Sequence, residues 1–321
     1  MYEYQSLVCQ LTGMEVSNAG MYDGSTAAAE AALMACAIKK RSKVSMLDTL
    51  HPTYRDVIRT YVQARNFCVE TIESHSSVSS DSACVVVQQP NFFGCFEQIE
   101  TYVQKAHEVG ALLIAIVDPI SLGMFRSPGE YGADIAIADG QALGNPVSFG
   151  GPGLGIFACR REYLRQMPGR IVGRTVDVDG KPGYVMTLVT REQYIRRERA
   201  TSNICTSEAL AALAATVYLA TLGKRGLRQV AELCYHKAHY TADRIGKLKG
   251  YSLVFSQPFF KEFAVRCPVA PDRINRVLLK EGIIGGLDIS HMIDDNAMLI
   301  CVTEVNTKQE IDKLTEILGG F

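Results

Sequence analysis

The sequence lacks any long hydrophobic run, and this absence excludes a membrane-spanning helix. The longest apolar stretch extends from Ala111 to Val117, whereas a membrane span needs about 18 to 20 apolar residues. The N-terminal residues Met1–Gln5 also lack a basic segment followed by an apolar one, which is the pattern of a signal peptide. We therefore expect a soluble protein located in the cytoplasm.

A surplus of charge is also missing. The chain of 321 residues has 33 lysines and arginines and 34 aspartates and glutamates, which leaves a formal net charge of −1. Nucleic-acid-binding domains and proteins that bind anionic membranes normally carry a clear basic excess. The composition therefore gives no reason to expect nucleic acid or a membrane as a partner.

The ten cysteines include no CxxC pair, so a zinc ribbon or a thioredoxin-type site is not expected. Most of them have apolar neighbours, which is typical of buried, reduced thiols in the cytosol. Cys234, His236 and His239 lie close together on an expected helix and have the chemistry of metal ligands. No carboxylate completes the set in register, so we favour an ordinary helix face and expect no metal.

Short apolar segments alternate with helical patterns through the first part of the chain. This alternation predicts a mostly parallel sheet that is covered by helices on both faces. The expected strands are residues 44–47, 69–72, 84–87, 112–117 and 135–138. The expected helices are residues 4–11, 25–40, 54–64 and 96–109.

The later part of the chain has a different pattern. Two long helices are expected over residues 207–222 and 226–248, separated at Gly223. The tail then reads strand, helix, strand, helix over residues 262–266, 272–280, 299–302 and 308–318, which suits a small α+β domain. We predict a large domain over residues 1–205, followed by linking helices and the small domain over residues 206–321.

Gly24, Ser25 and Thr26 stand at the expected start of the alanine-rich helix. The free N–H groups and partial positive charge of a helix N-terminus, with two hydroxyl groups, are suited to a phosphate. The alternative is a plain helix cap without a ligand, and the local sequence favours this alternative. No Gly-Lys-Ser/Thr follows, so the segment is not a Walker loop.

Asp118 follows an apolar strand, at the place where ligands bind in open α/β sheets. In pyridoxal-phosphate enzymes an aspartate there pairs with the pyridine nitrogen, and the alternative is a turn residue before Pro119. Such enzymes also need a lysine for the Schiff base. No lysine occurs between Lys105 and Lys181. The glycines of Phe149–Gly155 do not match GxGxxG and favour a turn with unusual dihedral angles.

Together these segments resemble the glycine dehydrogenase (decarboxylating) of the glycine cleavage system, the P-protein, and within it the α-type subunit, subunit 1. The matching segments are Tyr4–Gln5, Leu11–Gly13, Asp23–Glu30, Gln89–Gly94, Pro128–Ala136, Asp139–Gln141, Ser148–Pro152, Met167–Gly173, Thr201–Thr206 and Cys301–Glu304. They extend over the whole chain, so the resemblance implies the aminotransferase-like fold of fold type I pyridoxal-phosphate transferases for the large domain.

The resemblance also implies an activity and partners. Glycine forms an aldimine with pyridoxal phosphate and loses CO2, and the aminomethyl group passes to the lipoylated H-protein. In the split enzyme the catalytic lysine belongs to the β-type subunit, subunit 2, and the resemblance places Gln141 at the corresponding position here. We therefore expect no covalently bound cofactor on this chain. Gly24, Ser25, Thr26 and Asp118 are expected to be vestigial or to line a cleft.

The family's α-type subunit carries a substantial region upstream of the Tyr-Gln segment, whereas this sequence begins at Met1, three residues before Tyr4. We expect a subunit without that region, which pairs with the β-type subunit in a heterotetramer made of two such pairs. The alternative is a catalytically inactive scaffold or fragment that retains the aminotransferase fold.

Overall fold

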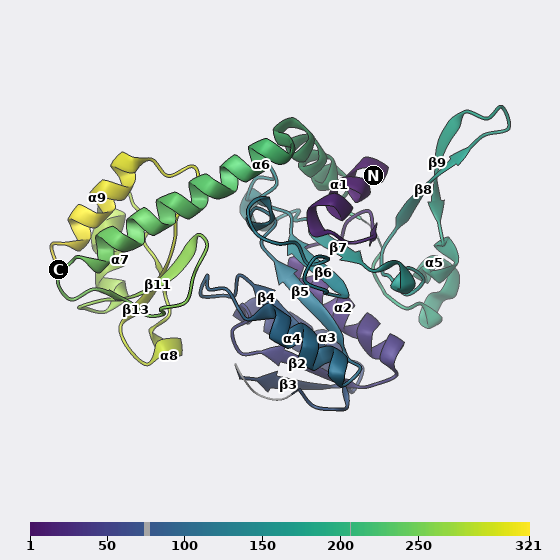
Figure 1. Ribbon diagram of the computed structural model, residues 1–321, viewed down its shortest axis with the longest axis horizontal. Coiled ribbons are helices and arrows are strands. Elements are labelled where there is room, and N and C mark those ends of the chain that lie inside the picture. Colours follow the sequence, from purple (N-terminus) through teal and green to yellow (C-terminus); the bar gives the residue numbers. More distant parts are fainter. Residues whose placement is uncertain (74–77, 206) are drawn as a thin grey trace. The chain divides into compact units, whose positions relative to one another are not determined.

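The structure of the protein is a computed structural model, which describes residues 1–73, 78–205 and 207–321. Its contacts divide the chain into two compact units (Figure 1). Unit 1 comprises Met1–Gln89 and Gln98–Leu227, and unit 2 comprises Pro90–Glu97 and Arg228–Phe321. The predicted domain division after residue 205 stays a prediction.

Unit 1 is built on a sheet of seven strands in the order β1-β7-β6-β5-β4-β2-β3. The strands are β1 (Val16–Ser17), β2 (Lys43–Leu47), β3 (Cys68–Ile72), β4 (Ser82–Gln89), β5 (Leu112–Val117), β6 (Ile135–Asp139) and β7 (Gly155–Cys159). The run from β6 to β3 is parallel, and β7 and β1 add antiparallel strands at the other edge. The expectation of a mostly parallel sheet is confirmed.

The helices of unit 1 cover both faces of this sheet. They are α1 (Tyr2–Thr12), α2 (Gly24–Lys39), α3 (Pro52–Gln63), α4 (Ile99–Glu108) and α5 (Gln193–Arg196). The crossover through α3 leads from β2 to the sheet edge at β3, whereas the crossover through α4 leads from β4 in the opposite direction to β5. Because such crossovers are right-handed, α3 and α4 lie on opposite faces. The alanine side chains of α2 allow it to pack closely on α3 and on the central strands.

A separate two-stranded hairpin in unit 1 consists of β8 (Ile171–Val176) and β9 (Pro182–Thr187). Its strands pair only with each other among the described strands, as Figure 1 shows. The Gln5 side chain of α1 holds its base, since it accepts a hydrogen bond from the Val172 N–H at 2.9 Å and donates one to the Val172 carbonyl at 3.0 Å. The strands of this hairpin were not predicted from the sequence.

Helix α6 (Ala209–Gly246) includes both long helices that the sequence predicted. The backbone leaves the helical region at Gly223, where φ is 59° and ψ is −174°. This is the residue at which the first predicted helix ends. The shorter helices are the 3-10 turns Ser121–Gly123, Ser148–Gly150, Arg161–Tyr163, Val189–Arg191 and Arg197–Arg199.

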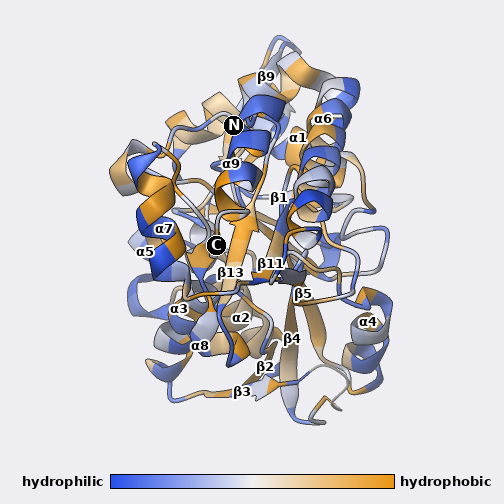
Figure 2. Cartoon of the chain, turned by 90° about the vertical axis from the view of Figure 1, so that its left-hand side faces the viewer, coloured by the Kyte–Doolittle hydropathy of each residue, from blue (hydrophilic) through white to orange (hydrophobic). Residues whose placement is uncertain are grey.

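Unit 2 contains an antiparallel sheet in the order β10-β11-β13-β12. Its strands are β10 (Ser252–Leu253), β11 (Glu262–Arg266), β12 (Leu287–Asp288) and β13 (Ala297–Cys301), and its helices besides the end of α6 are α7 (Pro271–Lys280), α8 (Ser290–Ile293) and α9 (Lys308–Leu318). In Figure 2, β13 is hydrophobic while α7 and α9 carry hydrophilic and hydrophobic segments side by side. This pattern matches helices that bury one face in the core of unit 2.

None of the described helices is long and apolar enough to cross a membrane. Likewise, residues 1–73, 78–205 and 207–321 contain no group of three or more histidine, cysteine, aspartate or glutamate side chains that could hold a metal ion. Cys234 and His239, which have the chemistry of metal ligands, make other contacts. The Cys234 thiol lies 3.2 Å from Glu304 Oε2, and His239 Nε2 lies 3.0 Å from the Phe259 carbonyl oxygen.

Candidate functional site

The carboxyl ends of β5 and β6 meet the first turn of α2, and the structure brings several predicted site residues together there. Asp118 directly follows β5, Asp139 ends β6, and Gly24 begins α2. The hydroxyl of Tyr54 on α3 lies over Gly24, because a Cβ added at Gly24 would come within 2.1 Å of Tyr54 Oη. Only glycine fits at this position without displacing the tyrosine. We call Asp23, Gly24, Tyr54, Asp118 and Asp139 the strand-end site.

Carboxylates of the chain itself occupy the N-terminus of α2. The Gly24 N–H donates to Asp139 Oδ2 at 3.2 Å, and the Thr26 N–H donates to Asp23 Oδ1 at 2.8 Å. The Ser25 hydroxyl also donates to Asp23 Oδ1, at 2.6 Å. Asp23 and Thr26 form a reciprocal capping box. These are the contacts that the plain-cap interpretation of this segment predicts.

The electrostatics of the strand-end site oppose a phosphate. Burial raises the pKa of the half-buried Tyr54 hydroxyl, and the negative charges of Asp139, Asp23 and Asp118 raise it further. A phosphate group carries about two negative charges near neutral pH, so it would meet three carboxylates there. The Tyr54 hydroxyl also fills the space next to Gly24. The residues of this chain thus do not fit the phosphate of pyridoxal phosphate.

Asp118 and Gln141 both take part in local hydrogen bonds between a backbone N–H group and a carboxylate. Asp118 Oδ1 accepts a hydrogen bond from the Ile120 N–H at 2.9 Å, and its carbonyl oxygen accepts one from the Ser121 hydroxyl at 2.7 Å. These contacts are those of a turn residue. The Gln141 N–H donates to Asp139 Oδ1 at 2.9 Å, so Gln141 follows directly on the carboxylate that caps α2. Their assignment as cleft-lining or vestigial residues stays a prediction.

The glycine-rich segment after β6 has the unusual dihedral angles that the sequence predicted. The φ angles of Gly150 and Gly151 are 107° and 148°, values in the region that favours glycine. The segment forms a turn before β7, and it has no helix after it of the kind found in dinucleotide-binding motifs.

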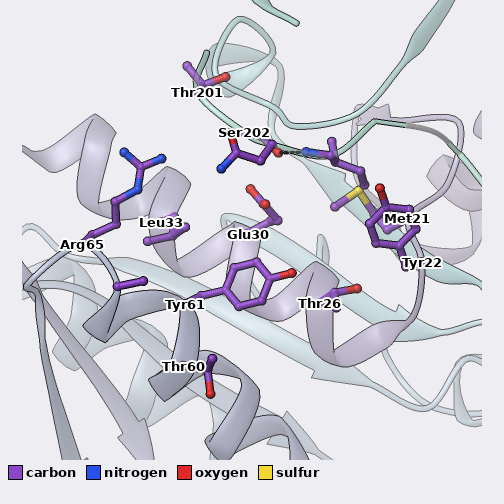
Figure 3. A pocket seen from close by; sticks show the side chains of 13 residues that line it. Met21, Tyr22, Thr26, Glu30, Leu33, Thr60, Tyr61, Arg65, Thr201 and Ser202 are labelled. Carbon is purple, nitrogen blue, oxygen red and sulfur yellow. Dashed lines mark hydrogen bonds between the residues drawn. The ribbon is translucent and has the colours of Figure 1, made fainter. Parts of the chain in front are cut away.

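A pocket of about 340 Å³ in unit 1 was not predicted from the sequence. Residues from the first turns of α2, the end of α3 and the segment before α6 line it: Met21, Tyr22, Thr26, Glu30, Leu33, Thr60, Tyr61, Ala64, Arg65, Thr201, Ser202, Asn203 and Ile204. Figure 3 shows the Glu30 side chain in the middle of this pocket, with Arg65 to one side. We call it the Glu30 pocket. Thr206, the last residue of the matching segment nearby, lies outside the described residues.

Glu30 is a buried carboxylate, and only 7% of the residue is exposed. Burial raises the pKa of its carboxyl group, which a hydrogen bond from Ser202 and the positive charge of Arg65 partly offset. The Ser202 oxygen accepts a hydrogen bond from the Ile204 N–H at 3.1 Å, which leaves the hydroxyl proton available to Glu30. The sequence signal for this residue is a glutamate within an alanine-rich helix, where it has apolar neighbours on both sides.

Glu30→Gln is expected to stabilise the chain above pH 4.5, the ordinary pKa of a glutamate, and not below it. Because burial raises the folded-state pKa, the unfolded chain releases the Glu30 proton first, so the wild type loses stability as the pH rises. Tyr61 from α3, Arg65 just after α3, Tyr22 before α2 and Ser202 line the same pocket as this carboxylate. Urea unfolding of the variant and the wild type, below and above pH 4.5, measures the difference in their unfolding free energies. A stability difference that is independent of pH would contradict the expectation.

His51 has a structural role at the start of α3. His51 precedes α3, and its ring nitrogen Nδ1 accepts a hydrogen bond from the Thr53 N–H at 3.1 Å. The backbone N–H of His51 donates to Gln88 Oε1 at 2.8 Å. His51 thereby caps α3 and ties its start to the end of β4.

Comparison with known proteins identifies the family to which this chain belongs. The sequence profile described as "Glycine cleavage system P-protein" matches residues 1–318. The chain belongs to the glycine cleavage system P-protein family. It is 51% identical to the probable glycine dehydrogenase (decarboxylating) subunit 1 of Desulforamulus reducens, over 100% of this chain and 75% of that protein.

Solved structures agree with this assignment to the P-protein family. A crystal structure of glycine decarboxylase (P-protein) of the glycine cleavage system in inhibitor-bound form matches with a TM-score of 0.97 and 40% identity, over 99% of this chain and 74% of that one. An alanine–glyoxylate aminotransferase from Nostoc sp. matches with a TM-score of 0.66 and 21% identity, over 99% of this chain and 85% of that one. The second match shows the fold alone, and the aminotransferase-like fold is confirmed.

Proposed function

We propose that this chain is the subunit of glycine dehydrogenase (aminomethyl-transferring, decarboxylating) that lacks the Schiff-base lysine. A second P-protein subunit, the β-type, would supply the lysine and hold pyridoxal phosphate. The observation that carries the proposal is the whole-chain match to subunit 1 of the enzyme, in a chain without lysine between Lys105 and Lys181. The carboxylates and the Tyr54 hydroxyl at the start of α2 support the assignment of the cofactor to the partner.

Exposed apolar side chains support a partner subunit. On α6, Leu210, Leu213 and Val217 are 79%, 57% and 56% exposed, and their spacing places them on one face of the helix. The hairpin adds Val176, Tyr184, Val185 and Met186, and the glycine-rich turn adds Phe149. Apolar patches of this kind mark protein–protein interfaces. We call Leu210, Leu213 and Val217 the α6 face.

The subunit would work with glycine as substrate and with lipoylated H-protein as acceptor of the aminomethyl group. We propose a cytoplasmic heterotetramer of two α/β pairs as its assembled form. This chain would then contribute structure and surface to the partner's active site rather than a residue that bonds covalently to substrate. The relatives named for the same enzyme support this assignment.

Exchange of labelled bicarbonate with the carboxyl group of glycine tests the proposal. We expect exchange only when this chain, a β-type subunit, pyridoxal phosphate and lipoylated H-protein are present together. With pyridoxal phosphate alone, the isolated chain should show no visible absorption band of an internal aldimine, because no lysine lies between the end of β6 and Lys181. Such a band would overturn the lysine argument. Neither exchange nor complex formation would favour an inactive scaffold or fragment.

A further inference from the structure

We propose that the Glu30 pocket binds a small zwitterionic α-amino acid, with Glu30 as partner of its ammonium group and Arg65 as partner of its carboxylate. The site is separate from the Schiff-base chemistry assigned above, and it needs neither pyridoxal phosphate nor the second subunit. None of the five residues of the strand-end site lines the Glu30 pocket.

The first argument is the buried charge of Glu30. A carboxylate that is 7% exposed is costly to ionise unless it is paired. Ser202 gives it one neutral hydrogen bond. Among residues 1–73, 78–205 and 207–321, no cation comes within 4.0 Å of it to form an ion pair. A ligand ammonium group in the pocket would provide the missing positive charge.

The second argument is the position of Arg65. It lines the same pocket from the end of α3, is exposed to solvent, and is near enough for its charge to lower the Glu30 pKa. The two side chains do not close on each other as an ion pair, so space remains between them. Figure 3 shows the Arg65 guanidinium group and the Glu30 carboxylate on different sides of this space. Opposite charges in that arrangement complement the two charged ends of an amino acid, and a guanidinium group binds carboxylates in a bidentate way.

The third argument is the composition of the remaining wall. Six of the residues that line the pocket carry a hydroxyl group: Tyr22, Thr26, Thr60, Tyr61, Thr201 and Ser202. A pocket of about 340 Å³ is at the small end of the range of ligand sites and exceeds the needs of glycine. The hydroxyl groups suit a side chain that makes hydrogen bonds. L-Serine is therefore the probe we choose, with its carboxyl-free analogue ethanolamine and its amine-free analogue glycerate.

Isothermal titration of the full chain with these three compounds tests the proposal. L-Serine should bind more tightly than either analogue, by about tenfold or more, because each analogue lacks one charge-assisted contact. Glu30→Gln should weaken L-serine and ethanolamine by about tenfold or more. Arg65→Ala should weaken L-serine and glycerate by a similar factor and leave ethanolamine unchanged.

Arg59→Ala is the matched control, since Arg59 is on α3, which ends two residues before Arg65, and does not line the pocket. It should leave all three affinities unchanged. Glutamine has nearly the same size and shape as glutamate, so Glu30→Gln should leave α2 intact. The urea unfolding curve of the variant reports whether it is folded. No heat of binding from L-serine, or equal binding by the wild type and Glu30→Gln, would overturn the proposal. Since the titration uses the chain alone, its failure leaves the exchange experiment above unaffected.

Discussion

Leu213→Asp together with Val217→Asp is expected to abolish the complex with the β-type subunit and the exchange activity that depends on it. Both side chains are more than half exposed in this chain, so the unfolding free energy of the isolated chain should change by about 0.5 kcal/mol or less. At an interface each replacement removes apolar burial and introduces an uncompensated charge. The two changes together should weaken association by roughly a thousandfold, or about 4 kcal/mol.

Gel filtration and titration against the β-type subunit measure this loss, and the exchange assay reports its consequence. Leu279→Asp with Val305→Asp is the matched control, because these residues of unit 2 are 66% and 73% exposed and lie outside the α6 face. The control should bind normally. Full association of the Leu213 and Val217 variant would show that the α6 face is not part of the interface.

The sequence predicted the regular elements well where periodicity and chain breaks agree. The five predicted parallel strands are all present, and α1 ends at Gly13, whose φ of 68° suits a glycine. The predicted helix over residues 96–109 begins three residues later, at Ile99, because Pro90–Glu97 folds with unit 2 instead. The short strand β1 and the exposed strands β8 and β9 were missed, since two residues or a half-exposed hairpin leave no clear pattern of burial.

The candidate sites show a sharper limit. Local sequence identified Gly24 and Thr26 as a helix start and favoured a cap, but the carboxylate that accepts the Gly24 N–H comes from Asp139, 115 positions away. Tyr54 is likewise brought over Gly24 from a different helix. No periodicity in one sequence reveals such contacts. Glu30 belongs to the matching segment Asp23–Glu30, yet its burial and its relation to Arg65 depend on how α2 packs against α3.

The most informative sequence feature is the absence of lysine between Lys105 and Lys181, because this absence does not depend on tertiary contacts. The structure adds a second, independent observation, because carboxylates occupy the start of α2 and do not fit the phosphate group of pyridoxal phosphate there. Under the proposed function the Schiff-base lysine belongs to another subunit, so this chain would not need an open anion site here. Filling that site with Asp23 and Asp139 stabilises the helix N-terminus instead.

Gly94→Ala is expected to destabilise unit 2 by about 3 kcal/mol or more. Gly94 has a φ of 82°, and a Cβ there would lie 1.9 Å from the carbonyl oxygen of Glu262 in β11. It belongs to a tight turn in which Asn91 Oδ1 accepts hydrogen bonds from the N–H groups of Phe93 and Cys95, at 3.0 and 3.1 Å. The turn is therefore held close to β11, and a methyl group can enter only if the strand backbone moves.

Gly282→Ala separates this clash from the cost of the backbone angle. Gly282 has a similar φ of 76°, but a Cβ there would meet nothing within 4 Å. Its replacement should cost only about 1 kcal/mol, which is the conformational penalty alone. Urea unfolding of both variants gives the comparison. Equal losses of unfolding free energy would mean that the β11 backbone can move away from the added methyl group at little cost. A larger loss for Gly94→Ala would show that the close approach of the turn to β11 stabilises unit 2.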